Sequence, residues 1–404
     1  MIVLTARYAT TAQNDPKLLS LIPAETKVYR AFNPEVPYHV RDRIWKKVAP
    51  PRMAAEIAVS QDLGGWNQPW KKAVRRLVQR VASPDVQVGW AHFAISQACR
   101  LIPKHDIQSV LLNIPPFSSM KIGIAIKRRF PNVQLISDIR DDWVGYYLPM
   151  FDGAASDDKR RLAVRLEREL IECSDFVSAV TPAQRQAIRE RYPDQPESKF
   201  FCTPNGYSPD SFRNFTPRRH EFDGMVVTYF GSVYVNPVYS PKAYLDALDA
   251  LPEEVSRRIQ TRFIGRIPPE ANQLFAGRRS FIVRLGFMAH EEGIRYLEET
   301  DYLLVIARDR TTHAGKLFDY LPTGKPILAV TPPTGEIAGI LERTGGGSVL
   351  PEDPSAMSQT LMQAYERWRS GNLAFIPDRK AIEAYSWPSL VAGLARYTGL
   401  CGSP

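Results

Sequence analysis

The sequence predicts an α/β protein with two doubly wound halves, and three observations predict this fold class. Short apolar runs rich in β-branched residues alternate with helical patterns, which is typical of βαβ units and parallel sheets. The alternation stops in residues 205–224, which carry proline, glycine, asparagine and charge but no periodic apolar face, and then it starts again. A chain of 404 residues is also long enough to form two hydrophobic cores.

The first half, residues 1–212, alternates strands and helices from its beginning. Its apolar runs predict strands at residues 2–5, 27–31, 109–113, 133–138, 176–180 and 199–203. Apolar residues spaced three and four apart predict helices at residues 89–102, 119–129, 157–171 and 182–191.

The second half, residues 213–385, repeats the alternation. Strands are predicted at residues 226–230, 260–264, 281–285, 302–306 and 327–329. Helices are predicted at residues 241–251, 290–298, 315–321, 336–343 and 354–369, and a last helix lies in residues 386–404. Sheets of this kind bind ligands at the carboxyl ends of their strands, so two such halves predict a binding cleft between them.

Composition and charge narrow the classes of protein. No run of about 18 apolar residues occurs, and the first residues lack the features of a signal peptide. The 4 cysteines and 6 histidines are scattered without metal-binding or disulfide spacing, so we expect no metal site and a cytoplasmic location. The net charge of +9 suggests an anionic partner: nucleic acid, a membrane surface or a phosphorylated ligand.

The most informative segment is His313-Ala-Gly-Lys-Leu-Phe-Asp-Tyr-Leu-Pro-Thr-Gly-Lys-Pro, which follows a predicted strand. Gly315 would begin a helix, where free N–H groups and the helix dipole favour an anion. Lys316 in the first turn is unfavourable for that dipole unless an anion lies nearby. Asp319 follows one turn later, where a carboxylate could accept hydrogen bonds from ribose hydroxyls. A solvated Lys–Asp pair on a surface helix is an equally good interpretation of the spacing alone.

Further candidates lie where other predicted strands end. Gly231-Ser232 and Gly265-Arg266 follow two strands of the second half, where a tight turn could approach a pyrophosphate. Arg308 and Arg310 precede the predicted helix at 315 and could bind a diphosphate bidentately. A surface arginine is the alternative for Arg266. Arg140, Asp141 and Asp142 end a strand of the first half, where they would either bind an acceptor or stabilise their own loop.

The segment from His313 resembles the C-terminal motif of family-four glycosyltransferases of the GT-B fold. Five other segments resemble that family in the right order, within residues 109–350: Ser137-Asp-Ile-Arg-Asp-Asp-Trp, Ser178-Ala-Val-Thr-Pro, Phe201-Cys-Thr-Pro-Asn-Gly-Tyr, Leu285-Gly-Phe-Met-Ala-His-Glu-Glu, and Thr334-Gly-Glu-Ile-Ala-Gly-Ile-Leu. The sequence departs from the family in three places. Thr311 stands where many members have a glutamate, Met120 stands where a histidine is usual, and a first strand with a glycine-rich loop is missing.

The resemblance implies a retaining, nucleotide-sugar-dependent glycosyltransferase, with the acceptor on residues 1–212, the donor on 213–385 and the helix of 386–404 crossing back to the first lobe. No protein-bound metal or further cofactor is required, although magnesium is compatible with the site. We expect the donor to contact Gly231, Ser232, Gly265, Arg266, Gly315, Lys316, Leu317 and Asp319. The expected catalytic groups are Lys316, Arg308 and Asp319, and the expected acceptor-side residues are Ser119, Met120, Arg140, Asp141 and Asp142.

A basic helix with tryptophans is predicted at residues 66–83, with Trp70 and Leu77 on its apolar face and Lys71, Lys72 and Arg75 on the other. Such a helix suits an anionic membrane surface, and an ordinary helix packed on the lobe is the alternative. A lipid-linked glycan is therefore the expected acceptor. No recognition module supports nucleic acid as the partner. A noncatalytic nucleotide-sugar-binding or partner subunit and a GT-B-like nucleotide-sugar epimerase remain as alternative functions.

Overall fold

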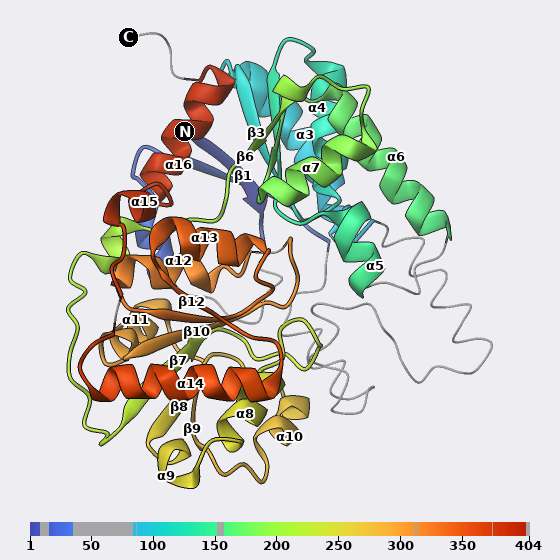
Figure 1. Cartoon of the computed structure of the whole chain (residues 1–404). Coiled ribbons are helices and arrows are strands. Elements are labelled where there is room, and N and C mark those ends of the chain that lie inside the picture. Colours follow the sequence, from blue (N-terminus) through green and yellow to red (C-terminus); the bar gives the residue numbers. More distant parts are fainter. Residues whose placement is uncertain are drawn as a thin grey trace. The chain divides into compact units, whose positions relative to one another are not determined.

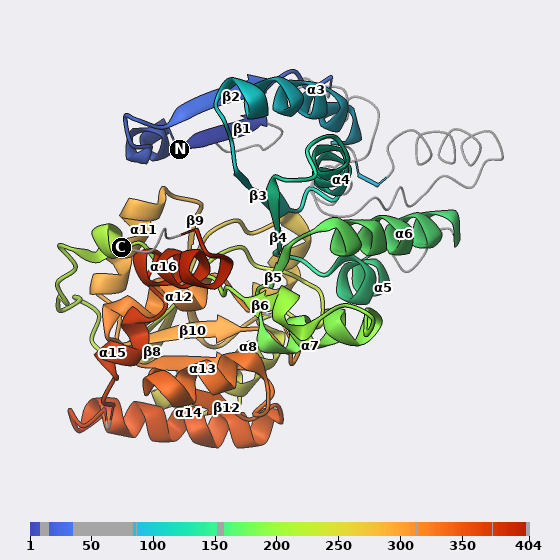
Figure 2. The same ribbon diagram turned by 90° about the horizontal axis from the view of Figure 1, so that it is seen from above.

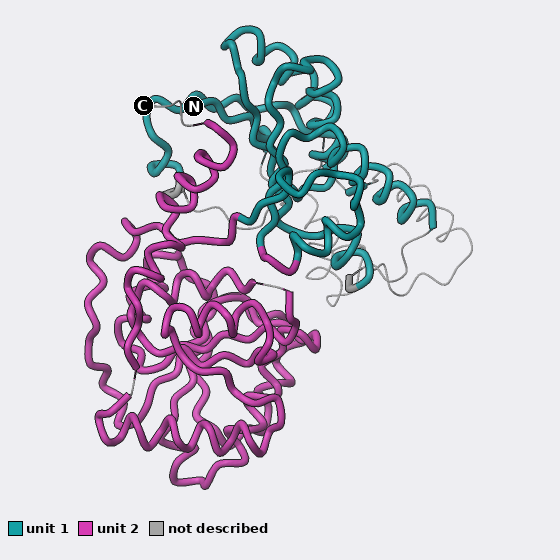
Figure 3. Tube along the Cα trace, turned by 45° about the horizontal axis from the view of Figure 1, so that its top comes forward, with its two compact units in different colours: residues 1–180, 184–202 teal, residues 181–183, 203–404 magenta. Residues whose placement is uncertain are grey.

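The structure is a computed structural model that describes residues 1–8, 16–34, 84–85, 87–151, 157–311, 313–373 and 375–400. The chain divides into two compact units (Figure 3). Unit 1 comprises residues 1–180 and 184–202, and unit 2 comprises residues 181–183 and 203–404. The boundary at 202/203 lies earlier in the chain than the predicted change-over at 212/213. The predicted basic helix at 66–83 lies outside the described residues.

Unit 1 contains a four-stranded parallel sheet and a separate parallel pair of strands. The four-stranded sheet has the order β3-β4-β5-β6, formed by β3 (Ser109–Ile114), β4 (Gln134–Ile139), β5 (Phe176–Ala179) and β6 (Phe200–Cys202). The pair consists of β1 (Ile2–Ala6) and β2 (Lys27–Ala31), and α3 (Val88–Lys104) packs against both of its strands (Figure 2).

The other helices of unit 1 follow the strands in βαβ fashion. They are η1 (Pro16–Leu21), α4 (Ser119–Arg129), η2 (Trp143–Tyr147), α5 (Leu148–Phe151), α6 (Asp157–Cys173), α7 (Pro182–Arg191), which begins in unit 2, and η3 (Glu197–Lys199). The side chains of α3, α4 and α6 that face the sheet form one apolar core with Ile114, Leu135 and Ile139, because their apolar residues recur at helical spacing.

Unit 2 is a doubly wound half with a six-stranded parallel sheet (Figure 1). Its order is β12-β11-β10-β7-β8-β9, formed by β7 (Met225–Phe230), β8 (Ile259–Ile264), β9 (Phe281–Gly286), β10 (Tyr302–Ile306), β11 (Ile327–Val330) and β12 (Gly347–Leu350). The chain runs outward from β7 to β9 and then returns to place β10 on the other side of β7. This reversal of strand order between β7 and β10 is a topological switch point.

Helices cover both faces of the second sheet. One face is covered by α8 (Lys242–Asp249) and α14 (Pro354–Arg369), and the other by α11 (His290–Glu298), α12 (Lys316–Tyr320) and α13 (Glu336–Thr344). Each face of the sheet has its own apolar core. The remaining elements are η4 (Pro209–Phe212), α9 (Glu253–Ser256), η5 (Pro269–Ala271), α10 (Asn272–Phe275), η6 (Leu321–Thr323), α15 (Arg379–Glu383) and α16 (Trp387–Thr398). Helix α16 groups with unit 2, and its predicted crossing to the first lobe stays a prediction.

The segment predicted as a linker is attached to unit 2 by polar contacts. Thr216 donates its N–H to Glu298 Oε1 at 3.2 Å, and Arg218 Nε lies 3.0 Å from Glu298 Oε2. The Nε2 atom of His220 lies 2.8 Å from Asp301 Oδ2, which also accepts the N–H of Val226. The linker therefore runs along the amino-terminal side of β7 and β10 in fixed contact with the second sheet.

Candidate functional site

The candidate site lies where β7, β8 and β10 end, at the carboxyl edge of the second sheet. Gly231 and Ser232 follow β7, Gly265 and Arg266 follow β8, and Arg308 follows β10. Hydrogen bonds continue past the strands: Gly231 N–H donates to Ile264 O and Gly265 N–H donates to Gly286 O, each at 2.7 Å. The structure thus brings these sequence-predicted turns together beside the switch point, where parallel α/β sheets bind ligands.

Lys316 is the central charged group at this edge. Its Nζ atom lies 3.5 Å from the centroid of the Tyr229 ring, the arrangement of a cation–π contact. Among the described residues its ammonium makes no hydrogen bond and no ion pair, although the side chain is half-buried. Burial lowers the pKa of Lys316 to about 7, because a desolvated ammonium without a counter-ion favours its neutral form. A bound anion would supply the missing counter-charge.

Glycine is required at two neighbouring strand ends beside this lysine. A Cβ atom on Gly231 would lie 2.7 Å from Lys316 Cε, and one on Gly265 would collide with Gly231 O. Both glycines have a positive φ, of 152° at Gly231 and 136° at Gly265, which other residues rarely adopt. The turn at Gly231 therefore approaches Lys316 more closely than any other residue type would allow, and Gly265 allows the turn after β8 to pack against Gly231.

Arg308 lies directly after the buried end of β10. Its N–H donates to Val238 O at 2.9 Å, and this bond fixes the loop that follows β7. The guanidinium lies 3.9 Å from Glu352 Oε2 and stays one-third exposed, at 34%. This is a weak surface pair.

Asp319 contacts a residue that the sequence motif did not predict. Its Oδ1 atom lies 3.1 Å from Nε2 of His290, the first residue of α11. The His290 ring stacks on Phe230 at the end of β7, with ring centroids 5.9 Å apart and planes at 27°. No sequence signal joins these residues, since His290 and Asp319 lie on different helices that only the fold brings together.

The two other expected donor contacts differ in exposure. Gly315 is exposed and caps α12, which begins at Lys316 rather than at Gly315 as predicted. Leu317 is fully buried in the apolar core beneath α12. Leu317 therefore holds the helix on the sheet, and its expected contact with a donor stays a prediction.

The expected acceptor-side residues fall into different environments of unit 1. Arg140 Nη1 lies 3.6 Å from Oδ1 of Asp138, a carboxyl whose pKa is raised because it is buried, and Asp141 is exposed. Asp142 is buried, accepts the N–H of Gly145 and pairs with Arg191 at 2.7 Å.

Arg191 also contacts Glu167, which is fully buried, so Asp142 belongs to a structural network that sequence reasoning missed. Ser119 and Met120 are buried at the start of α4. Their expected contact with an acceptor, like that of Asp142, stays a prediction.

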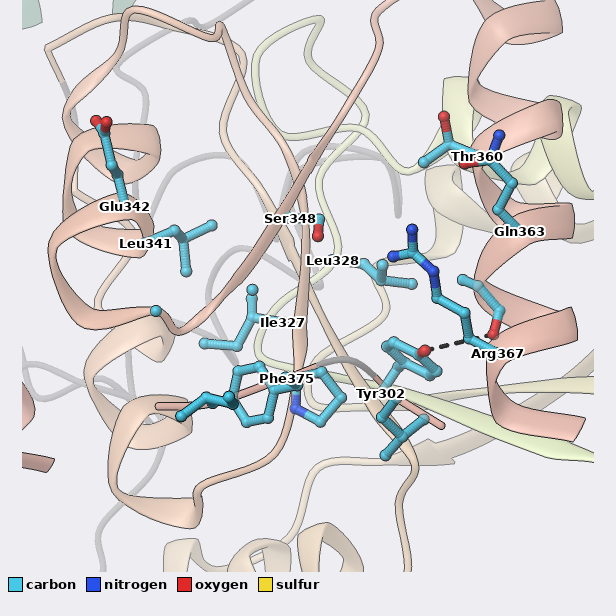
Figure 4. Close-up of a pocket in the computed structure, with 16 residues that line it drawn as sticks. Tyr302, Ile327, Leu328, Leu341, Glu342, Ser348, Thr360, Gln363, Arg367 and Phe375 are labelled. Carbon is cyan, nitrogen blue, oxygen red and sulfur yellow. Dashed lines mark hydrogen bonds between the residues drawn. The ribbon is translucent and has the colours of Figure 1, made fainter. Parts of the chain in front are cut away.

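A separate cavity of about 430 Å³ lies at the opposite edge of the second sheet (Figure 4). It is lined at the amino ends of three strands by Tyr302, Ile327 and Ser348, and from α14 by Arg367. Tyr302 donates its hydroxyl hydrogen to Ala364 O at 3.3 Å. Because strands of one parallel sheet share their direction, this cavity is distinct from the site around Lys316.

Two features that the described part of the chain lacks bear on its partners. No group of three or more histidine, cysteine, aspartate or glutamate side chains is placed there to hold a metal ion. None of the helices described there has the length and apolar character needed to cross a membrane.

Solved structures of known proteins match this chain over nearly its whole length. No protein family model and no curated protein matches the sequence. The structure of Anabaena Alr3699/HepE in complex with UDP and glucose matches with a TM-score of 0.62 at 12% identity, over 99% of this chain and 100% of that one. WaaG, a glycosyltransferase involved in lipopolysaccharide biosynthesis, matches with a TM-score of 0.56 at 13% identity, over 100% of both chains.

A protein assigned as an epimerase also has a similar fold. A Listeria monocytogenes protein assigned as a UDP-N-acetylglucosamine 2-epimerase matches with a TM-score of 0.52 at 10% identity, over 100% of this chain and 97% of that one. Identities this low show the fold alone. The predicted fold class is confirmed: the chain is a mixed α/β protein with parallel sheets, two Rossmann-like units and the fold of GT-B glycosyltransferases.

Proposed function

We propose that this protein is a retaining glycosyltransferase that moves a sugar from a nucleotide diphosphate-sugar to a glycan or lipid-linked glycan. One observation carries the proposal: the ammonium of Lys316 is desolvated at the carboxyl edge of the second sheet, without a counter-ion among the described residues. A diphosphate is the ligand that this charge and place suit. The UDP and glucose held by the similarly folded HepE support the choice.

In this proposal Lys316 and Arg308 bind the diphosphate. The bond between the anomeric carbon and the diphosphate oxygen breaks, and the acceptor oxygen forms its bond to that carbon on the same face. The departing diphosphate takes the proton of the acceptor hydroxyl, so no carboxylate nucleophile is needed. The two cations stabilise the charge that develops on the leaving group, which lowers the barrier without a required metal ion. Retention of configuration rests on the family resemblance.

The acceptor belongs to unit 1 in this proposal. Arg140 and Asp141 follow β4, at the carboxyl edge of the first sheet, and are the candidate contacts. A lipid-linked glycan at the inner face of a membrane suits the basic segment 66–83. Sedimentation with anionic and neutral liposomes tests this part: the full chain should pellet with the anionic vesicles at moderate salt. Equal recovery in the supernatant with both kinds of vesicle would contradict the membrane contact.

A noncatalytic nucleotide-sugar-binding subunit is the second candidate, and one position favours it. Thr311, which stands where related enzymes have an acid, is exposed and donates its hydroxyl hydrogen to Asp309 at 3.1 Å. If Asp309 does not replace the missing acid, the protein would bind a nucleotide-sugar without transferring the sugar. An assay that follows both binding and turnover separates the two functions.

The decisive experiment is a titration with a panel of nucleoside diphosphates and their sugars, by thermal shift and calorimetry. We expect one diphosphate to be preferred, and Lys316→Met to weaken its binding at least about tenfold, because the charge-assisted contact is lost. Lys380→Met, at an exposed lysine of α15, is the matched control and should bind normally. Slow hydrolysis of one bound sugar would identify the donor and support an enzyme. Binding without hydrolysis or transfer would favour the subunit, and no binding at all would overturn the proposal.

A further inference from the structure

The contact between His290 and Asp319 joins two helices at the candidate site. His290 begins α11, after β9, and Asp319 lies in α12, after β10, yet Nε2 and Oδ1 are 3.1 Å apart. A carboxylate only accepts hydrogen bonds, so Nε2 of His290 carries the hydrogen. This fixes which ring nitrogen faces Asp319.

The His290 ring packs on one side against an aromatic ring. The ring stacks on Phe230, the last residue of β7, at a centroid distance of 5.9 Å. Gly293, one turn further along α11, allows the helix to approach, because a Cβ atom there would collide with the Phe230 ring. The histidine thus lies between a strand end and a carboxylate, with 42% of its side chain exposed.

Asp319 has capacity left for a ligand. His290 uses one acceptor position on Oδ1, and no other hydrogen bond of Asp319 is made among the described residues. An ionised carboxylate has about four acceptor positions, and the side chain of Asp319 is 28% exposed. Its second oxygen, Oδ2, is therefore available to accept hydrogen bonds from hydroxyl groups.

We propose that His290 is a positioning residue that orients Asp319 so that its carboxylate accepts hydrogen bonds from the paired hydroxyls of a ribose. This inference rests on the proposed function, because it places the ribose next to the diphosphate bound by Lys316, one turn away on α12. The ligand it selects is a ribonucleoside diphosphate. A deoxyribose would leave the oriented carboxylate with an unmet acceptor, which weakens binding by about 10- to 100-fold.

The test compares the dissociation constants of UDP, 2′-deoxy-UDP and 3′-deoxy-UDP by calorimetry, or of the guanosine series if the panel selects guanine. His290→Phe keeps a ring against Phe230 and removes the N–H donor. His290→Gln keeps a donor near the place of Nε2 and removes the ring. Asp319→Asn sets the baseline for a site without the carboxylate.

We expect the wild-type protein to prefer UDP over at least one deoxy analogue by about tenfold or more. His290→Phe should reduce that ratio to near the value of Asp319→Asn, and His290→Gln should keep it within about threefold of wild type. A histidine that only held the helices together would weaken all three ligands equally and leave the ratio unchanged.

Two outcomes would overturn the inference, and they are distinguishable. If His290→Phe binds UDP with the wild-type preference, His290 does not position Asp319, and the proposed function still stands. If the wild-type protein binds no nucleoside diphosphate, the proposed function fails and this inference fails with it. Circular dichroism and the unfolding midpoint of each variant show whether it is folded under the conditions of the titration.

Discussion

Methionine at position 316 would keep most of the length of the lysine side chain and remove its charge. The wild-type ammonium is desolvated against the Tyr229 ring without a counter-ion among the described residues, so the ligand-free protein is destabilised by its own binding group. Lys316→Met should therefore raise the free energy of unfolding while it removes diphosphate binding. A residue kept for function commonly has this effect on stability.

The size of the effect follows from the pKa. A change of the Lys316 pKa from 10.5 to about 7 corresponds to at most about 5 kcal/mol. Part of the side chain stays exposed and the neighbouring groups relax, so we expect a gain of about 1 to 3 kcal/mol at pH 6. The folded-state pKa is lowered, so the destabilisation is fully present below pH 7 and is relieved as the pH rises toward 10.5. The gain from Lys316→Met should fall by about half between pH 6 and pH 9.

Urea unfolding of both proteins at pH 6, 7.5 and 9 measures this difference. All other groups titrate equally in the two proteins, so their contribution cancels. Lys325 is the matched control, because its pKa is also lowered by burial, to about 8, but its ammonium donates to the carbonyl oxygens of Glu298 and Thr300. Lys325→Met should destabilise the protein, since it removes the donor to the Thr300 carbonyl and one of the two donors to the Glu298 carbonyl, which also accepts the Arg218 N–H.

A variant Lys316→Met that is less stable than wild type at pH 6 would refute this reasoning. A stability gain of the same size at all three pH values would also refute it, since the gain would then come from packing and not from the removed charge.

Three further predictions follow from the same contacts. Diphosphate binding should raise the pKa of Lys316 and take up about half a proton at pH 7 and almost none at pH 5.5, which calorimetry in buffers of different ionisation enthalpy measures. Gly265→Ala should lower the free energy of unfolding by about 2 kcal/mol or more, because the new Cβ atom collides with Gly231 O at a positive φ. Gly277→Ala is the control: its new Cβ atom meets open space, so it should cost about 1 kcal/mol. Equal losses for the two variants in urea unfolding would contradict the clash at Gly265. Burial raises the pKa of Glu167, so its contribution to stability is present at low pH and is lost as the pH rises through the folded-state pKa. Glu167→Gln should then gain stability relative to wild type as the pH rises above 4.5, and a constant difference between the two proteins would exclude this titration.

Local sequence patterns predicted most of the strands and helices, because each needs only its own apolar spacing. The strand at Tyr302–Ile306 and the helix at Pro354–Arg369 have the predicted bounds. The strand β12 was missed, since no strand was predicted after residue 329. Gly347 is in fact required in a strand, since a Cβ atom there would collide with the backbone of Ile327. That collision depends on a neighbouring strand, which no local pattern reveals.

The candidate site was predictable to the extent that it follows strand ends. Gly231 and Arg308 follow neighbouring strands at one carboxyl edge, and Gly231 lies against Lys316. The expected contact of Arg308 with the same ligand stays a prediction. The partners of the predicted groups were not predictable. Arg191 lies far along the chain from Asp142, and His290 lies on another helix from Asp319, so only the tertiary fold pairs them.

The strand order of unit 2 has a consequence for the protein during its synthesis. β7 is a central strand whose Met225, Val226 and Val227 are completely buried, but β10, which pairs with one of its edges, is made only after residues 231–301. A nascent chain that has formed β7, β8 and β9 therefore exposes an apolar strand edge that could pair with another chain. The helix that carries Lys316 is made later still. The pairing of β7 with β10 can thus form only after residue 306 has been made, and until then this apolar strand edge is open to other chains.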